Sequence, residues 1–174
     1  MAKCVRIPMI KMTNIKNRSK GFGHSVFGIY LLLFFSGGCA NVHIPDYISD
    51  ENPYRRIFYA DFSSTLAATA QSLESLGWPI SKTAEPSIFE RSRLTEEGNR
   101  QQTLLFTEIR QTPLFLGTRY ARVNAYLRAV TDHTTEVELR YLTVTSVPLK
   151  SFYNYRKDHF IKRVFQEIER RLSQ

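Results

Sequence analysis

The alternating stretch TRYARVNAYLRAV, residues 118–130, decides the fold of this chain. From residue 122 onward, polar or aromatic side chains alternate with aliphatic ones. Successive side chains of a β-strand point to opposite faces, so this period of two predicts a strand with one dry and one wet face. The dry face holds Val123, Ala125, Leu127 and Ala129, and the wet face holds Arg122, Asn124, Tyr126 and Arg128.

A second alternating stretch follows a polar turn at residues 131–134. Apolar residues again alternate with charged ones: the apolar set is Val137, Leu139 and Tyr141, and the charged set is Glu136, Glu138 and Arg140. Two such strands joined by a short turn predict an antiparallel hairpin whose dry face needs a cover. Its wet face offers Arg-to-Glu pairs between the strands.

The end of the chain supplies that cover as a predicted helix over residues 155–172. Its apolar residues recur every three or four positions, which places them on one side of a helix. Pro148 precedes the helix, and Asn154 is a candidate cap. We expect the stripe to lie across the dry face of the sheet. The stripe comprises Phe160, Ile161, Val164, Phe165, Ile168 and Leu172.

A shorter helix is expected at residues 63–76, with Asp61 or Ser63 as its cap. Gly77 stands where a helix commonly ends in a left-handed turn, and Pro79 forbids continuation. Trp78 is then expected to fold back on Leu73, as in a Schellman motif.

Turn residues separate the remaining predicted strands, which are expected at 56–60, 78–83, 87–94 and 102–111. With the central hairpin, the order is strand, helix, five strands, helix. Such an order predicts one α+β domain over residues 54–174, with a curved antiparallel sheet packed against the long C-terminal helix.

Residues 1–38 have the three parts of an export signal. A basic stretch at 3–20 precedes ten residues of apolar run at 26–35, and small residues follow at 36–38. A membrane-spanning helix needs about 20 apolar residues, so a signal peptide is expected. The alternative is that residues 21–40 insert into the membrane as a stable anchor. Translation starting at Met12 instead of Met1 is a separate alternative.

The formal charge of +8 at pH 7 belongs to this leader. Six of the 24 basic residues lie in 1–38, which has no acidic residue, so the other 18 face 16 acidic ones. The predicted domain therefore has little electrostatic attraction for a phosphate backbone, and a nucleic-acid partner is not expected.

Ser36, Gly37 and Gly38 stand directly before Cys39, and this pattern resembles the lipobox of bacterial lipoproteins. The resemblance implies cleavage before Cys39 and acyl chains on its thiol. The pattern departs from the family at Ser36, where leucine is usual. Ala40 implies sorting to the periplasmic face of the outer membrane. Ordinary secretory cleavage after Ala40 and an unmodified thiol are the alternatives.

Residues 39–53 are polar, contain two prolines and show no sustained period. They are interpreted as a lipidated tether between membrane and domain.

The whole order of elements, on a lipoprotein, resembles the helix-grip domains of envelope lipoproteins such as the lipoprotein C subunit of the β-barrel assembly machine. The stretches that carry the likeness are 61–62 through 76–78, 134–139 and 163–172. The resemblance covers one helix-grip unit, residues 54–172, and implies a fold and an envelope setting.

No local motif for catalysis or cofactor binding is present in the sequence. His24, His43, His133 and His159 do not stand at metal-ligand spacing with one another or with cysteine. The sequence has no phosphate-cradling glycine loop and no Gly-x-Ser-x-Gly turn. We therefore expect no enzyme activity, metal or cofactor.

Leu114, Phe115 and Leu116 are the candidate docking residues. Pro113 and Gly117 flank them, which favours a loop tip with exposed apolar side chains. The alternative is that they tuck under the sheet edge as core.

The sequence thus predicts a non-catalytic, lipid-anchored accessory or scaffold protein that docks on another envelope protein. A carrier that binds an apolar ligand between the sheet and the last helix is the alternative. Large side chains are expected to fill that space, namely Trp78, Tyr141, Phe160 and Phe165.

Overall fold

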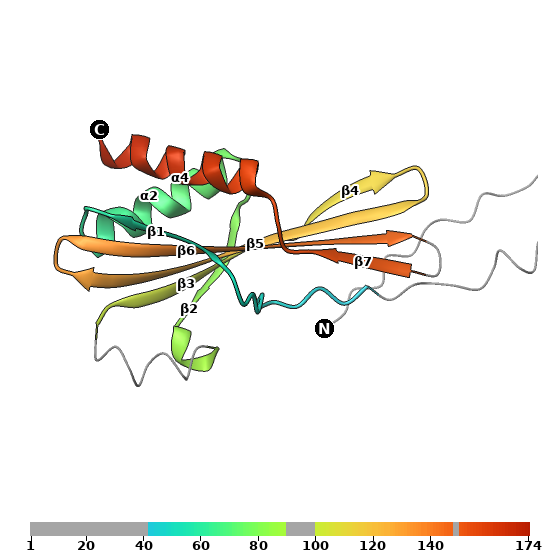
Figure 1. The fold of residues 1–174 in the computed structure, drawn as a ribbon, viewed down its shortest axis with the longest axis horizontal. Coiled ribbons are helices and arrows are strands. Elements are labelled where there is room, and N and C mark those ends of the chain that lie inside the picture. Colours follow the sequence, from blue (N-terminus) through green and yellow to red (C-terminus); the bar gives the residue numbers. More distant parts are fainter. Residues whose placement is uncertain (1–41, 90–99, 148–149) are drawn as a thin grey trace, which may run out of the picture. The chain divides into compact units, whose positions relative to one another are not determined.

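A computed structural model describes residues 42–89, 100–147 and 150–174 of the chain. The predicted α+β class is confirmed, since these residues build a seven-stranded antiparallel sheet and two helices (Figure 1). The elements in chain order are β1 (Tyr54–Phe58), α2 (Phe62–Ser75), β2 (Ile80–Ala84), a 3₁₀ turn (Pro86–Ile88), β3 (Gln102–Thr107), β4 (Arg110–Leu114), β5 (Gly117–Thr131), β6 (Thr134–Val147), β7 (Lys150–Asn154) and α4 (Asp158–Leu172).

The predicted central hairpin is the long pair β5 and β6. In one half of the sheet the strand order is β1-β6-β5-β3-β2. In the other half, β4 pairs with the beginning of β5 and β7 pairs with the end of β6. Helices α2 and α4 lie over the first half, and β4 and β7 extend the second half beyond them (Figure 1).

The dry face and its helical cover are as the sequence predicts. Val123, Ala125 and Leu127 of β5 are fully buried, and they form one core with residues of both helices. From α4, the buried stripe is Ile161, Val164, Phe165 and Ile168. The apolar period of that helix therefore encodes its packing on the sheet.

Both predicted ends of α2 are confirmed. At the start, an Asp61 Oδ1 accepts hydrogen bonds from the Ser64 amide at 2.9 Å and the Ser63 hydroxyl at 2.5 Å, which hold the pKa of Asp61 well below its usual range. At the end, the Gly77 amide donates to the Glu74 carbonyl and the Trp78 amide to the Leu73 carbonyl, each at 2.9 Å. With Gly77 at φ 79°, this is a Schellman motif.

The predicted single strand over residues 102–111 is wrong, because it divides into β3 and β4. Two residues of β5 stand opposite Thr107, Glu108 and Ile109 at the division, which forms a bulge. The Thr107 hydroxyl accepts from the Val123 amide and donates to the Val123 carbonyl, both at 3.0 Å. A side chain thus satisfies backbone groups that the ladder leaves open.

Further boundaries differ from the sequence prediction. The strands expected at 56–60 and 78–83 lie at 54–58 and 80–84. The strand expected at 87–94 begins instead as a 3₁₀ turn, since Pro86 opens it and the Phe89 amide bonds to the Pro86 carbonyl at 2.8 Å; residues 90–94 lie outside the described residues. The last helix begins at Asp158 because β7 occupies residues up to Asn154. The Asn154 side chain accepts from the Arg156 amide at 2.8 Å and does not cap α4.

The tether interpretation is wrong for residues 42–50, which pack on the face of the sheet that was expected to be wet. Ile48 is 0% exposed and lies against Leu142 and Val144, with Val42 and Ile44 beside them. The folded unit therefore begins ahead of the predicted boundary at Tyr54. These residues, called the strap below, have no regular period because they form no helix or strand.

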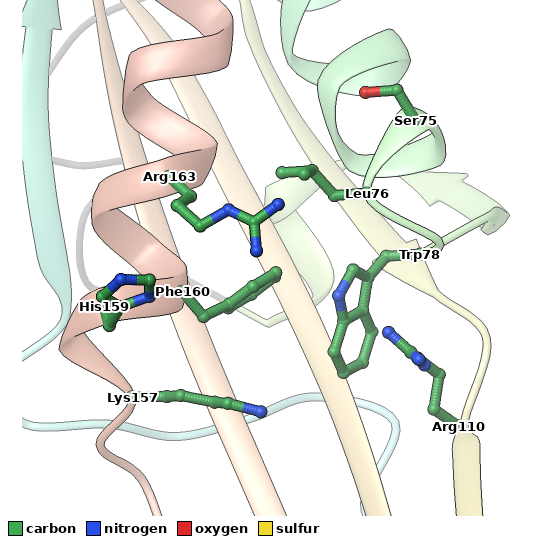
Figure 2. A pocket seen from close by; sticks show the side chains of 8 residues that line it. All are labelled: Ser75, Leu76, Trp78, Arg110, Lys157, His159, Phe160 and Arg163. Carbon is green, nitrogen blue, oxygen red and sulfur yellow. The ribbon is translucent and has the colours of Figure 1, made fainter.

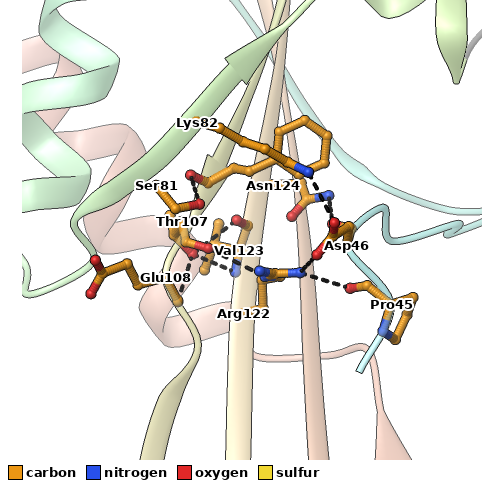
Figure 3. Close-up of polar contacts among 10 residues, drawn as sticks. Pro45, Asp46, Ser81, Lys82, Thr107, Glu108, Arg122, Val123 and Asn124 are labelled. Carbon is orange, nitrogen blue, oxygen red and sulfur yellow. Dashed lines mark hydrogen bonds and ion pairs between the residues drawn. The ribbon is translucent and has the colours of Figure 1, made fainter. Parts of the chain in front are cut away.

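A polar cluster fastens the strap to the sheet (Figure 3). The buried Arg122 guanidinium donates to an Asp46 carboxylate oxygen at 2.7 Å and to the Pro45 carbonyl at 3.1 Å. Asn124 donates to the Asp46 carbonyl at 3.0 Å, and Lys82 forms an ion pair with the Asp46 carboxylate at 2.9 Å. Hydrogen bonds from Lys82 and Arg122 lower the pKa of Asp46.

Further along the same face, charged side chains are paired between strands. The predicted Arg-to-Glu pairing is confirmed for Arg128 and Glu136, at 2.5 Å across β5 and β6. The buried Glu138 accepts from Arg140 at 2.6 Å and from Arg55 of β1 at 2.9 Å. Buried charges need such partners, because a lone ion loses its hydration without compensation.

Phe165→Ala should lower the free energy of unfolding by about 3–5 kcal/mol, because the ring is buried against Phe58 at a centroid distance of 6.1 Å. Chemical denaturation measures this change. The matched control is Phe152→Ala on β7, where the ring is half exposed, and its cost should stay within about 1 kcal/mol. Equal costs for the two variants would contradict the packing of α4 described above.

Asp46→Asn should destabilise the fold fully above the ordinary carboxyl pKa of 3.8, progressively less as the pH falls from there, and little below the lowered folded-state pKa. The folded-state pKa is lowered, so the carboxylate stabilises the fold at neutral pH, and this contribution is lost as the pH falls through the lowered pKa. The cost at pH 7 should be about 1 kcal/mol or less, because the Asp46 side chain is mostly exposed. Thermal unfolding from pH 2 to pH 7 measures it, with Asp132→Asn as the control. A constant difference at every pH would refute the ion pair as the cause.

Candidate functional site

The predicted lipidation residue, Cys39, lies outside the described residues, so lipidation stays a prediction. Val42, the first described residue, follows it by three positions. No helix in residues 42–89, 100–147 and 150–174 is long and apolar enough to cross a membrane.

The predicted docking residues lie at the tip of the β4–β5 hairpin. Leu114 pairs with Gly117, so Phe115 and Leu116 form a two-residue turn. Phe115 is 99% exposed and Leu116 is 64% exposed, whereas Leu114 is half-buried. The alternative that all three tuck under the sheet edge is therefore wrong for the two turn residues.

Two residues around the tip explain why the chain turns there. Pro113 lies within β4, an edge strand that pairs only with β5, where its missing amide hydrogen leaves no gap in the ladder. Gly117 has φ 147°, and a Cβ at this position would lie 1.9 Å from the Ser146 carbonyl oxygen. Glycine is therefore required where β5 begins beside the end of β6.

The same end of the sheet carries two further exposed aromatic residues. Phe152 and Tyr153 of β7 are each about half exposed, and the Lys150 ammonium lies 4.9 Å from the centre of the Phe152 ring. Together with Phe115 and Leu116, they make this end more apolar than an ordinary solvated edge. This half of the sheet is the one that α2 and α4 leave uncovered (Figure 1).

The space proposed for a carrier's ligand is filled by side chains. The Trp78 ring packs on Phe160 at a centroid distance of 5.2 Å and on Tyr141 at 6.1 Å. This filling agrees with the expectation from the sequence. Two cavities of the described residues lie at the margins of the core, and charged and polar side chains line each of them beside apolar ones. Such cavities do not favour an apolar carrier.

One of these cavities, of about 400 Å³, opens between the end of α2 and the beginning of α4. Figure 2 shows its lining: Ser75, Leu76, Trp78, Arg110, Lys157, His159, Phe160 and Arg163. The Arg110 guanidinium lies 4.9 Å from the centre of the Trp78 ring. The Lys157 ammonium lies 5.3 Å from the centre of the Tyr141 ring and 5.8 Å from that of Phe160. This basic pocket was missed by the sequence reasoning, because its residues come from three separate segments.

The other perturbed ionisable groups have structural causes. Hydrogen bonds and charge from Arg170 lower the pKa of Glu167 to about 2 on the exposed side of α4. Burial and the hydrogen bond to Asp158 raise the pKa of Tyr54. Within the part of the chain that the structure describes, no three His, Cys, Asp or Glu side chains are grouped as metal ligands.

The sequence reasoning also missed the strap. Its one sign in the sequence is Asp46, an acidic residue that follows Pro45 in a polar segment.

Comparison with protein-family models finds no match, and comparison with curated proteins finds no significant relative.

Proposed function

We propose that this chain is a non-catalytic, lipid-anchored accessory or scaffold protein of the bacterial cell envelope, which docks on another envelope protein through the tip of the β4–β5 hairpin. The carrying observation is the exposure of Phe115 and Leu116 at the tip. Exposed apolar side chains contribute nothing to the stability of their own domain. A partner that covers them removes apolar surface from water, which is worth roughly 1.5–3 kcal/mol for each such side chain.

The proposed anchor rests on the export signal and on Cys39 behind its small residues. Two or three acyl chains would hold the protein to one leaflet, since each buried methylene contributes about 0.8 kcal/mol. Residue Ala40 favours the outer membrane, so the domain would face the periplasm.

The strap supports a docking site at membrane level. Val42 packs in the same small cluster as Val144, and Val144 pairs with Tyr120, three residues from the tip-side end of β5 at Gly117. Three residues of strand span roughly 10 Å. Val42 therefore lies in the half of the sheet that carries the hairpin tip. Because only three positions separate Val42 from Cys39 in the sequence, we propose that the partner lies at or near the membrane surface.

We propose that the domain is a single helix-grip unit. It would be similar to each helix-grip unit of the lipoprotein C subunit of the β-barrel assembly machine. The support is an antiparallel sheet with the last helix across its dry face. This likeness is one of fold and setting, and the partner is inferred from the exposed tip alone.

Cys39→Ser should abolish lipidation, because the thiol that would carry the acyl chains is removed. Intact-mass analysis measures this on protein purified from membranes. The wild-type protein should have the mass of residues 39–174 with the acyl chains added. The variant should keep its leader or be cut elsewhere. A wild-type mass without acyl chains, or an N-terminus at Asn41, would rule out the anchor.

Phe115→Ser should weaken partner association roughly 10- to 100-fold, corresponding to the loss of one covered phenylalanine, and leave the melting temperature nearly unchanged. Quantitative co-purification from detergent-solubilised membranes measures the association. Tyr59→Ser is the control, because Tyr59 is 91% exposed in the link between β1 and α2. Unfolding of Phe115→Ser, or unchanged recovery of every co-purifying protein, would count against docking through the tip.

A further inference from the structure

The pocket between α2 and α4 gathers three basic side chains that are far apart in the sequence. Arg110 stands at the beginning of β4, Lys157 directly precedes α4, and Arg163 lies in the second turn of that helix. The pocket has a volume of about 400 Å³, which lies within the range of small-molecule sites. In Figure 2 the Arg163 guanidinium reaches over Phe160 toward Leu76, and the Lys157 ammonium points toward Trp78.

The wall of the pocket is aromatic and fixed in place. Trp78 is almost fully buried, and its amide bonds to Leu73 in the Schellman motif that ends α2. Its ring meets Phe160 at 5.2 Å between centroids, and the planes of the two rings are inclined by 47°. Phe160 and Leu76, which are partly exposed beside Trp78, offer a flat or ring-shaped apolar group an existing contact surface.

No acidic group among the described residues pairs with these three cations. The side chains of Arg110, Lys157 and Arg163 form no ion pair or hydrogen bond there. Some other basic side chains are paired, as Arg55 and Arg140 are with Glu138. Asp158, the carboxylate next to Lys157 in the sequence, accepts a hydrogen bond from the Tyr54 hydroxyl and does not line the pocket.

Aromatic rings hold two of these cations at the pocket. Arg110 lies over the indole of Trp78, and Lys157 lies over Tyr141 and Phe160. Cation–π contacts of this kind restrict the side chains without cancelling their charge. An incoming anion therefore meets positive groups that are already placed.

We propose that this pocket binds a small organic anion, namely an acidic group carried on an aromatic or other flat apolar body. The apolar body lies on Phe160 and Leu76 beside Trp78, and the acidic group accepts hydrogen bonds from Arg163, Lys157 and Arg110. A neutral apolar ligand would cover the cations without pairing them, which is unfavourable. A bare inorganic anion lacks the apolar contact, and exposed ion pairs alone are weak. This site is independent of the lipid anchor and of docking through the hairpin tip.

Trp78 is the single tryptophan of the chain, so its indole N–H gives one resonance in an amide correlation spectrum and reports on the pocket directly. The full processed protein, in non-ionic detergent, is titrated separately with 2-naphthoate, with the neutral 2-naphthalenemethanol and with inorganic phosphate. We expect the Trp78 resonance to move with 2-naphthoate at the lowest concentration. The same order should appear in every detergent. Equal responses to the acid and the alcohol, or to the acid and phosphate, would overturn the proposal, as would no response to the acid.

Arg163→Gln and Arg110→Gln should each weaken 2-naphthoate binding at least about fivefold, because each removes one charged hydrogen-bond donor from the site. Lys162→Gln is the matched control: Lys162 is the neighbouring exposed cation of α4 and does not line the pocket. All three positions are exposed, so the variants should keep the wild-type melting temperature. Equal weakening by Lys162→Gln would show a general charge effect and overturn the proposed site.

Discussion

The long β5–β6 hairpin must be covered on both faces, and the rest of the structure follows from this constraint. On one face, Val123, Ala125 and Leu127 bury against α2 and α4. On the other face, Leu142 and Val144 are just as buried, although neither α2 nor α4 lies there; the strap covers them with Ile48. Because a sheet of this length exposes apolar side chains on both sides, an irregular segment ahead of β1 becomes part of the core. The strap therefore belongs to the folding unit, and its removal would expose Leu142 and Val144 to water.

The second face differs from the first because it also holds charges. Arg122, Glu138 and Arg140 are buried there, and each is paired or accepts hydrogen bonds from described neighbours. Apolar packing alone would let a segment without regular structure slide along the sheet. The contacts of Asp46 with Arg122 and Lys82, and of its carbonyl with Asn124, fix one register. We interpret the polar cluster as the element that gives the strap its position, while the buried apolar side chains provide most of its stability.

Local patterns in the sequence predicted those elements whose causes are local. The alternation of β5 and β6, the stripe of α4, the Asp61 cap and the Gly77 stop each depend on residues within a few positions, and all four are confirmed. The strap, the bulge at Thr107 and strand β7 depend on pairing with distant residues. No short sequence pattern therefore predicted them. The exposed tip at Phe115 was predictable because Pro113 and Gly117 bracket it. The basic pocket was not, since Arg110, Lys157 and Arg163 meet only after the sheet and both helices have formed.

The two halves of the sheet are suited to different tasks. The half under α2 and α4 has its apolar surface occupied, so what remains there for recognition is the charged margin around Trp78. The half formed by β4, β7 and the adjoining parts of β5 and β6 is not covered by α2 or α4, and it carries exposed apolar side chains at the hairpin tip and on β7. The tip suits a macromolecular partner, because a two-residue turn projects its side chains into solvent and does not enclose a ligand. The proposed small anion suits the margin, because a half-open pocket of about 400 Å³ brings cations together beside an aromatic wall. Since β5 and β6 run through both halves, either site can be altered at its exposed residues without disturbing the core that joins them.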